Sequence, residues 1–323
     1  MNFKGNSISE IIADAKNIGI AGHVRPDGDC IGSCLGLYRY IKDNYADVKV
    51  SVYLEEVPNA FGCLEDAKDI HTSFGVKEPF ELFIALDCGD EERLGKARQL
   101  FQNAKRTFCV DHHISNIGYA DTNYVVGGYS STSELLYWLM EDGKISKTCA
   151  SALYVGIAHD TGLFRHSCTT KQTMLAAGNL IDKDIPFSQL LDDTYSKKTN
   201  VQNQIMGRCL LESLVLFDGK VIASVLTGDM MDFYGATDSD LEGIIDQLRV
   251  TEGVEVALLI HQLKTQEYKV SMRSNGDVDV SKIAALYGGG GHVKAAGCTM
   301  GGSYHDIINN ITEQIEAQLM NNN

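Results

Sequence analysis

The chain has 323 residues, enough for about two domains at roughly 150 residues each. Hydrophobic residues make up 44% of the chain and charged residues 22%, which is ordinary for a globular protein with a sizeable core. With 28 Lys and Arg against 43 Asp and Glu, the net charge is -15, which argues against a surface that binds long duplex nucleic acid, since such binding requires phosphate neutralisation. A small polyanion in a locally positive or metal-filled cleft is still allowed.

The cysteines and the N-terminal residues indicate the compartment. Nine cysteines are scattered from Cys30 to Cys298 without a C-x-x-C pair, which favours reduced thiols over a disulfide framework or a zinc ribbon. The first residues lack the apolar core of a signal peptide, because Glu10, Asp14 and Lys16 interrupt it. No stretch approaches the ~18 apolar residues of a membrane span. We therefore expect a cytoplasmic protein without a membrane partner.

The first half of the chain alternates apolar, strand-like runs with amphipathic stretches. We expect strands at 17–23, 48–54, 81–87 and 106–111, and helices at 30–44 and 92–104. This alternation is typical of βαβ units, so it predicts a mostly parallel sheet flanked by helices. From about residue 131 the pattern becomes helical as far as the end of this domain.

The second half carries the pattern of a smaller α/β domain with a mixed sheet. It should open with a hairpin in which Asp218-Gly219 forms a two-residue turn. Further elements are expected at 240–250 (helix), 254–262 and 268–273 (strands) and 304–320 (helix). A helix at 199–214 would connect the two parts. The predicted organisation is a catalytic domain, a helical linker and a second domain at 1–190, 191–213 and 214–323.

Polar residues follow the ends of several of these apolar segments. Because the carboxyl ends of parallel strands open onto one crevice, we expect side chains at these ends to meet there. The first strand ends at His23, just before Asp27 and Asp29, and the third strand ends at Asp87. The fourth strand ends at Asp111-His112-His113, and a buried helix ends at Asp160. The expected cluster consists of His23, Asp27, Asp29, Asp87, His112 and Asp160.

Such a cluster predicts bound metal ions. Four carboxylates cannot share a few ångströms while ionised unless cations neutralise them. Mixed carboxylate and imidazole ligands suit manganese, zinc or iron, whereas an all-oxygen site would suit magnesium or calcium. Six ligands suffice for two metals about 3.5–4 Å apart with one bridging carboxylate, an arrangement that activates water in phosphatases and nucleases. A single Asp at a strand end is most often a turn or helix cap, so the prediction depends on the combination of four segments.

These segments are similar, in the same order, to the four motifs of the DHH phosphoesterase superfamily. The motifs are carried by residues 23–29, 87, 111–113 and 160–162. The sequence G-G-G-G-H-V-K-A-A-G at 288–297 resembles the signature of the DHH subfamily 1 associated domain. This signature separates the chain from the subfamily that contains inorganic pyrophosphatases. The resemblance covers essentially the whole chain and implies a compact, two-domain enzyme of the nanoRNase/pAp phosphatase type.

The resemblance also implies roles at the metal site. One divalent ion would be held by His23 and Asp27, and the other by Asp29, His112 and Asp160, with Asp87 bridging both. Mn²⁺ is the expected metal, with Mg²⁺, Co²⁺, Fe²⁺ and Zn²⁺ as alternatives. Asp87 and His113 are the expected catalytic residues, because His113 would stabilise the scissile phosphate or protonate the leaving oxygen. Asp111 would orient a ligand imidazole, or alternatively serve only as a strand-end cap.

Substrate contacts are expected in both domains. Arg273-Ser274, at the end of a predicted strand, resembles the family's Arg-Ser pair that contacts a terminal phosphate. The glycine run should form a loop, since each glycine costs roughly 0.5–1 kcal/mol relative to Ala in a helix or strand. Its N–H groups could then approach a phosphate or a base, so we assign substrate binding to Gly289, Gly290, Gly291 and His292. Arg165 and His166, which follow the Asp160 motif, are the expected contacts in the first domain.

The sequence therefore predicts a phosphoesterase that hydrolyses short oligoribonucleotides (nanoRNA), linear dinucleotides such as pApA, or pAp, by two-metal activation of water. Long duplexes would be excluded by the acidic surface and by a cleft between the domains that is closed behind the glycine loop. The alternatives are a cyclic dinucleotide phosphodiesterase, a polyphosphate hydrolase and a non-catalytic nucleotide-binding protein. The preferred substrate, the direction of digestion, the metal and the formation of a homodimer are left open.

Overall fold

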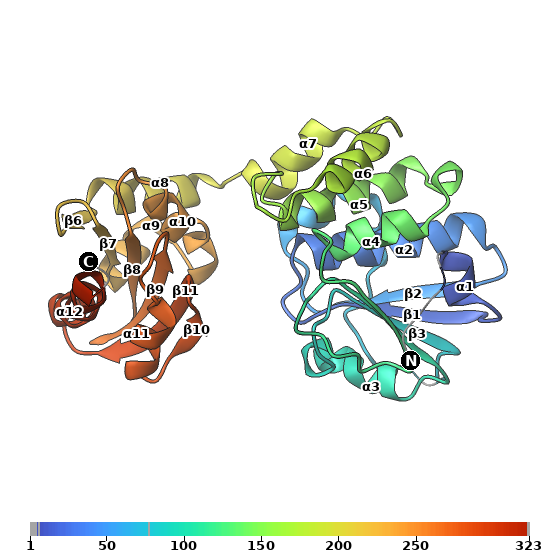
Figure 1. Ribbon diagram of the computed structural model, residues 1–323, viewed down its shortest axis with the longest axis horizontal. Helices are drawn as coiled ribbons and strands as arrows, with labels where there is room; N and C mark the ends of the chain where they lie inside the picture. Colours follow the sequence, from blue (N-terminus) through green and yellow to red (C-terminus); the bar gives the residue numbers. More distant parts are fainter. Residues whose placement is uncertain (1–4, 6, 77, 322–323) are drawn as a thin grey trace. The chain divides into compact units, whose positions relative to one another are not determined.

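The computed structural model describes residues 5, 7–76 and 78–321, which divide into two compact units, one up to Lys197 and one from Lys198 onward. Each unit is a β-sheet with helices on both faces, and each is described by itself (Figure 1). Within the described part of the chain, no helix combines the length and the apolar character needed to cross a bilayer. All nine cysteines are free thiols.

The first unit contains a five-stranded sheet in which every neighbouring pair is parallel. This confirms the mostly parallel sheet that the sequence predicts. The strand order is β2-β1-β3-β4-β5, so β3 lies at the centre and β5 at an edge. The sequence analysis missed β5, a short edge strand whose residues are mostly half-buried. The strands are β1 Asn17–Ala21, β2 Lys49–Tyr53, β3 Leu82–Leu86, β4 Thr107–Asp111 and β5 Thr122–Val125.

One face of this sheet is covered by three helices that carry several of the polar motifs. Their apolar side chains form the main core of the unit together with β1, β3 and β4. The helices are α2 Gly28–Asn44, α4 Thr132–Leu139 and α5 Lys147–Asp160. Gly32 allows α2 and α5 to cross closely, because a Cβ atom there would lie 2.6 Å from the carbonyl oxygen of Ala152. Around this core lie α1 Ile8–Ile12, α6 Lys171–Ile181 and α7 Phe187–Leu191.

The opposite face is covered by a second, smaller core. The sequence predicts one helix at 92–104, and this prediction is wrong in detail. Gly95 adopts a non-helical backbone with a φ of 53°, so the segment divides into a 3-10 helix and a short α-helix. These are Glu92–Ala97 and α3 Arg98–Gln102.

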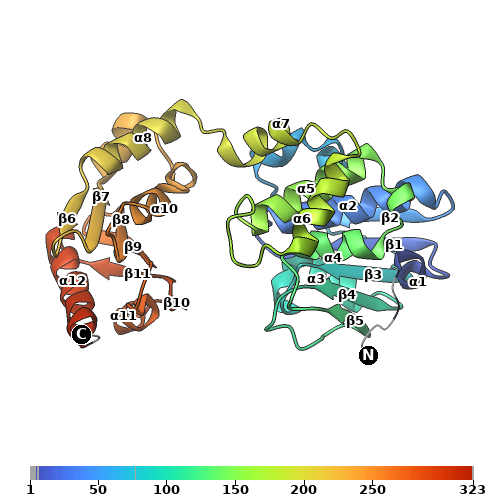
Figure 2. The ribbon, with the colours of Figure 1, turned by 45° about the horizontal axis from the view of Figure 1, so that its top comes forward.

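The second unit is built on a mixed six-stranded sheet of order β10-β11-β9-β8-β7-β6, which confirms the predicted fold class (Figure 2). Only the β7–β8 pair is parallel. The strands are β6 Leu214–Leu216, β7 Val221–Leu226, β8 Val256–Lys264, β9 Glu267–Ser274, β10 Gly290–His292 and β11 Ala295–Gly301. One face packs on α11 Val280–Leu286 and α12 Tyr304–Asn321. The other packs on α8 Asn200–Leu211, α9 Gly228–Tyr234 and α10 Ile244–Arg249.

Of two local predictions for this unit, one is confirmed and one is wrong. The β6–β7 hairpin reverses at Asp218-Gly219 as predicted, because the N–H of Lys220 donates to the carbonyl oxygen of Phe217 (3.1 Å) across these two residues. Asp218 and Gly219 adopt φ values of 52° and 91°, and positive values at both central residues are typical of a two-residue hairpin turn. The glycine run is only partly a loop, since Gly290 and Gly291 belong to β10 and pair with Gly297 and Ala296 of β11.

Candidate metal centre

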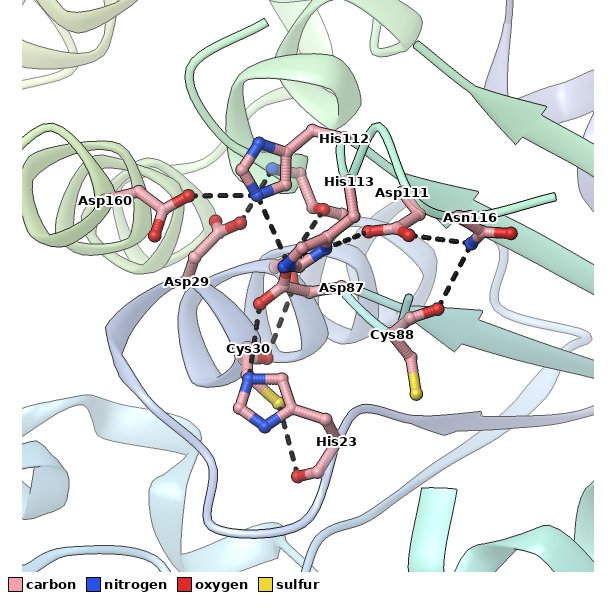
Figure 3. Close-up of polar contacts among 12 residues, drawn as sticks. His23, Asp29, Cys30, Asp87, Cys88, Asp111, His112, His113, Asn116 and Asp160 are labelled. Carbon is pink, nitrogen blue, oxygen red and sulfur yellow. Dashed lines mark hydrogen bonds and ion pairs between the residues drawn. The ribbon is translucent and has the colours of Figure 1, made fainter. Parts of the chain in front are cut away.

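The polar motifs of the first unit converge at the carboxyl end of its sheet (Figure 3). Asp87 directly follows β3, and His112 directly follows β4. His23 lies two residues beyond the end of β1, and Asp160 is the last residue of α5. The structure therefore brings together side chains from four separate segments. Ligand atoms lie within 4.8 Å of one another in three groups: His23, Asp27 and Asp87; Asp29, His112 and Asp160; and Asp87, His112 and His113.

Asp87 lies at the centre of the cluster, with its two carboxylate oxygens directed to different sides. Oδ2 is 3.5 Å from Nε2 of His23, and Oδ1 is 3.5 Å from Nε2 of His112. The side chain is buried, and the backbone has a φ of 52°, a left-handed conformation that is costly for residues other than glycine and is often found at functional sites. The backbone N–H of Asp87 donates to the carbonyl oxygen of Val110 (3.1 Å), which fixes this conformation against β4.

The first group lies between β1 and the start of α2. Nδ1 of His23 donates to the carbonyl oxygen of Val24 (2.8 Å), so Nε2 is left to face Oδ1 of Asp27 at 3.5 Å. Burial lowers the pKa of His23, but hydrogen bonds with Asp27 and Asp87 outweigh this effect and raise the pKa to about 11. Burial raises the pKa of Asp27, yet the bond with His23 brings it down to about 2. Asp27 also caps α2 by accepting from the N–H of Cys30 (3.1 Å).

The second group joins the start of α2 to the end of α5. Nε2 of His112 lies 3.0 Å from Oδ2 of Asp160, while its Nδ1 donates to the carbonyl oxygen of Tyr129 (3.4 Å). Burial lowers the pKa of His112, but the bond with Asp160 and the nearby carboxylates raise it to about 10. Asp29 is fully buried, and its pKa is raised well above the usual range by burial and by the charges of Asp87 and Asp160.

These donor sets fit divalent metal ions. Imidazole nitrogens and carboxylate oxygens together suit manganese, iron and zinc. The pKa of Asp29 is raised first by burial and then by repulsion from Asp87 and Asp160, and a bound divalent ion would remove that repulsion. The group of His23, Asp27 and Asp87 and the group of Asp29, His112 and Asp160 each offer one imidazole and two carboxylates. Asp87 belongs to the first group and also lies beside His112 of the second.

A chain of hydrogen bonds fixes His113 beside Asp87. Nδ1 of His113 donates to Oδ1 of Asp111 (2.7 Å) and lies 3.6 Å from Oδ1 of Asp87. Asp111 is fully buried, and its Oδ2 accepts from Nδ2 of Asn116 (2.7 Å), which also donates to the carbonyl oxygen of Cys88 (3.2 Å). The bond with Asp111 raises the pKa of His113. The structure thus places Asp111 against His113, and not against His112.

The start of α4 holds two of the carboxylates, a role that the sequence analysis missed. The N–H groups of Thr132 and Ser133 donate to Asp29 over 2.7 and 2.9 Å. The hydroxyl group of Thr132 also donates to Oδ1 of Asp87 (3.3 Å). The available signal was the S-T-S-E run, which reads as a helix start, and Ser131 does cap α4 through the N–H of Glu134. Only the tertiary structure shows that this helix end faces Asp29. Asn116 was also missed.

The predicted contacts Arg165 and His166 lie in the turn after α5. Nδ1 of His166 donates to the backbone carbonyl of Asp160 (3.3 Å), so this imidazole lies next to the second ligand group. Arg165 is exposed and donates from Nε to the carbonyl oxygen of Gly162 (2.8 Å) and from Nη2 to the hydroxyl of Tyr195 (3.4 Å). Gly162 has a φ of 54°, and a Cβ atom there would lie 2.4 Å from Nε2 of His166.

The predicted contacts of the second unit gather at one end of its sheet. Arg273 of β9 pairs with Ala295 of β11, and Ala295 pairs with His292 of β10, so Arg273 and His292 occupy the same rung two strands apart. The buried Ser274 donates its N–H to the carbonyl oxygen of Lys294 (3.0 Å). Gly289 packs so closely on β11 that a Cβ atom would lie 2.2 Å from the carbonyl oxygen of Gly297. Gly290 and Gly291 belong to β10, the edge strand that ends at His292.

Comparisons with known proteins agree with the resemblance seen in the sequence. Residues 17–157 match the model of the DHH family, N-terminal domain, and residues 218–321 match the model of the DHHA1 domain. The chain is 28% identical over 284 residues to the bifunctional oligoribonuclease and PAP phosphatase NrnA of Bacillus subtilis, covering 86% of this chain and 87% of that protein. It is 28% identical over 304 residues to the protein of the same name from Thermus thermophilus, covering 92% and 89%.

A solved structure shares the fold. An exopolyphosphatase-related protein from Bacteroides fragilis superposes with a TM-score of 0.85 at 24% identity, covering 96% of this chain and 94% of that chain. At this level of identity the likeness concerns the fold alone.

Proposed function

Because the chain carries a DHH domain followed by a DHHA1 domain and so belongs to the DHH family, we propose that it is a divalent-metal-dependent phosphoesterase that hydrolyses short oligoribonucleotides, linear dinucleotides such as pApA, and pAp. Relatives of this chain bear the names of both activities. The observation that carries the proposal is the placement of Asp87, whose two oxygens face two separate groups of metal-ligating side chains.

Within the proposal, His23 and Asp27 would hold one ion, Asp29, His112 and Asp160 would hold the other, and Asp87, which faces both groups, would contribute to each. Divalent ions bound there would neutralise the carboxylates and polarise both the phosphate and the attacking water. We take manganese as the metal, since the mixed donor sets suit it.

His113 is the proposed general acid. As water forms its bond to phosphorus and the bond to the leaving oxygen breaks, the N–H at Nε2 gives its proton to that oxygen. The proton lost by the water passes to solvent, and His113 regains one before the next turnover. Asp111 supports this role in two ways, because it occupies Nδ1 and raises the pKa of the imidazole, which favours the protonated form of His113.

Phosphate groups of the substrate away from the reacting bond would contact cationic and glycine-rich segments. Arg165 and His166 serve this purpose beside the metal ligands, and Arg273, Ser274 and the segment 289–292 serve it in the second unit. A planar guanidinium matches the geometry of a phosphate, and glycine N–H groups allow a close approach. Short substrates are favoured because the net charge of -15 repels long polyanions. The nine free thiols suit action in the cytoplasm.

The test is hydrolysis by purified protein with Mn²⁺ of a panel containing pAp, pApA, a cyclic dinucleotide, inorganic polyphosphate and long RNA. We expect turnover of pAp and pApA, and loss of turnover to background in Asp87→Asn. Asp184→Asn is the matched control, because Asp184 is an exposed carboxylate paired with Lys147 and should leave turnover unchanged. Near-normal activity of Asp87→Asn would contradict the metal assignment, and exclusive turnover of polyphosphate or of the cyclic dinucleotide would contradict the substrate class.

A further inference from the structure

A pocket of about 510 Å³ opens beside the metal centre, between the loop after β4 and strand β5. It is lined by His113, by residues 114 and 116–118 and by residues 123–127. Its volume lies in the range of small-molecule sites, roughly 300–1,000 Å³. The pocket shares His113 and Asn116 with the hydrogen-bond chain described above. Neither Arg165 nor His166 lines it, so it is distinct from the substrate contacts assigned so far.

Two isoleucines make part of this pocket apolar. Ile114 and Ile117 are 88% and 98% exposed, although both lie within four residues of His113. Large aliphatic side chains are normally removed from water, and two exposed ones lining one pocket are typical of a binding surface. Gly127 leaves room for Ile114, because a Cβ atom at Gly127 would lie 2.7 Å from Cγ1 of Ile114.

The polar side chains of the pocket are engaged within the protein. Nδ2 of Asn116 donates to Asp111, and its Oδ1 accepts from the N–H of Gly118 (2.8 Å). Oδ1 of Asn123 accepts from the N–H of Ala120 (3.1 Å), and its Nδ2 donates to the carbonyl oxygen of the same residue (2.8 Å). These amides therefore shape the wall of the pocket, and the isoleucines supply its adaptable contact surface.

We propose that this pocket receives the nucleoside that leaves when the phosphate ester is cleaved. The inference rests on the proposed function, in which His113 gives its proton to the leaving oxygen. That oxygen belongs to the ribose of the leaving nucleoside, so the nucleoside must extend from His113, and the pocket begins there. Apolar packing of Ile114 and Ile117 on the base and ribose, with both amides engaged elsewhere, implies that the site accepts purines and pyrimidines alike.

The test compares two ester substrates in the full-length protein with Mn²⁺. In pApA and pUpU the leaving group is a nucleotide, whereas in bis(p-nitrophenyl) phosphate it is p-nitrophenolate. We expect the double variant Ile114→Ser/Ile117→Ser to lower the ratio of kcat/KM for either dinucleotide to that for the aryl ester by about fivefold, mainly through KM, because uniform binding of the nucleoside is lost. Val250→Ser is the matched control, since Val250 is also β-branched and exposed (60%) but belongs to the second unit.

The outcomes are separable. Unchanged ratios for both dinucleotides would overturn the nucleoside pocket, as would a parallel loss on all three substrates, which would indicate damage to the metal centre. A loss for pApA with none for pUpU would overturn the base tolerance and indicate selective recognition. Failure of the unsubstituted protein to hydrolyse any dinucleotide, despite turnover of the aryl ester, would instead overturn the proposed function. The melting temperature of the double variant shows whether it folds normally. If it does not, the single variant Ile117→Ser is used in its place.

Discussion

The backbone N–H of Thr132 donates to Oδ2 of Asp29 over 2.7 Å. Asp29 belongs to α2 and Thr132 begins α4, so this bond joins two helices at the buried carboxylate of the metal centre. A helix N-terminus favours a negative charge, which offsets part of the free energy required to bury Asp29. Thr132 also donates from its hydroxyl group to Asp87, so this one residue orients two carboxylates of the metal centre.

Replacement of Thr132 should weaken metal binding without unfolding the chain. Thr132→Val keeps the backbone bond with Asp29 but removes the hydroxyl bond with Asp87. Residues that orient metal ligands typically contribute 10–100-fold to metal affinity, so we expect a loss of about tenfold in Mn²⁺ affinity with a matching fall in activity at limiting metal. Calorimetric titration measures the change. Thr148→Val is the control, because the hydroxyl group of Thr148 donates to Glu65 at the surface, and equal affinities for the two variants would contradict this role.

The His113–Asp111 pair should affect the chemical step more than binding. For Asp111→Asn we predict a fall in kcat of at least about a hundredfold on pApA, in the range of general acid catalysis, with little change in KM. The fall should be smaller for an ester of p-nitrophenol, whose leaving group departs without protonation. Equal losses on both substrates would show that Asp111 supports the metal centre and not proton transfer.

Manganese should stabilise the protein against unfolding. Cations remove the repulsion among the buried carboxylates Asp29 and Asp87 and the half-buried Asp160, and they bind the folded state in preference to the unfolded chain. At a free Mn²⁺ concentration of about 100 times Kd, one site contributes about 2.7 kcal/mol of stability. The melting temperature with EDTA and with Mn²⁺ measures this effect, which Asp87→Asn should largely remove. A similar shift in both proteins would place manganese elsewhere.

Two glycines in helices should respond in opposite directions to alanine. Gly32→Ala places a methyl group against the backbone of α5 and should destabilise the protein by about 1–3 kcal/mol. Gly178→Ala, in α6, meets no atom within 4 Å and should stabilise it by up to about 1 kcal/mol through helix propensity. Urea unfolding of both variants measures the change in the free energy of unfolding. An unchanged stability of Gly32→Ala would mean that α2 and α5 move apart at little cost.

His261 should make the second unit sensitive to acid. Its side chain is buried in β8, and within the described residues neither ring nitrogen has a hydrogen-bond partner. Burial lowers its pKa, despite Asp238 at 3.8 Å. Since the folded state then binds a proton less readily than the unfolded chain, stability falls as the pH drops below the unfolded value of about 6.5. Urea unfolding at pH 7.5 and 5.5 should show a smaller loss for His261→Leu than for the unsubstituted protein.

Patterns within a segment were predictable from sequence, whereas contacts between segments were not. The central strand β3 is entirely apolar and was evident from composition, and Asp87 at its end was predicted as part of the cluster. By contrast, β5 is only four residues long and half-buried, so its sequence carries little signal. Asn116 and Thr132 act through hydrogen bonds with Asp111 and Asp29, and nothing in their own surroundings along the chain indicates those partners.

The glycine run shows why a local rule failed. Four consecutive glycines disfavour a strand by their conformational entropy, which predicts a loop. In the structure Gly290 and Gly291 pair with Gly297 and Ala296 of β11, and the close approach of Gly289 and Gly291 to β11 leaves no room for side chains at these two positions. Tertiary packing therefore selects glycine for its small size at an edge strand, and the preference of the isolated segment is overridden.

The left-handed backbone of Asp87 has a consequence for mutational scanning at this position. Asparagine and aspartate tolerate left-handed backbone angles better than most other residues with a side chain. Asp87→Asn therefore replaces one carboxylate oxygen by an NH2 group without adding backbone strain. Alanine or glutamate would impose a steric penalty in addition to any chemical change. In a library of substitutions at residue 87, most variants would therefore combine a loss of stability with a loss of catalysis. The asparagine variant reports the loss of catalysis without the added backbone strain.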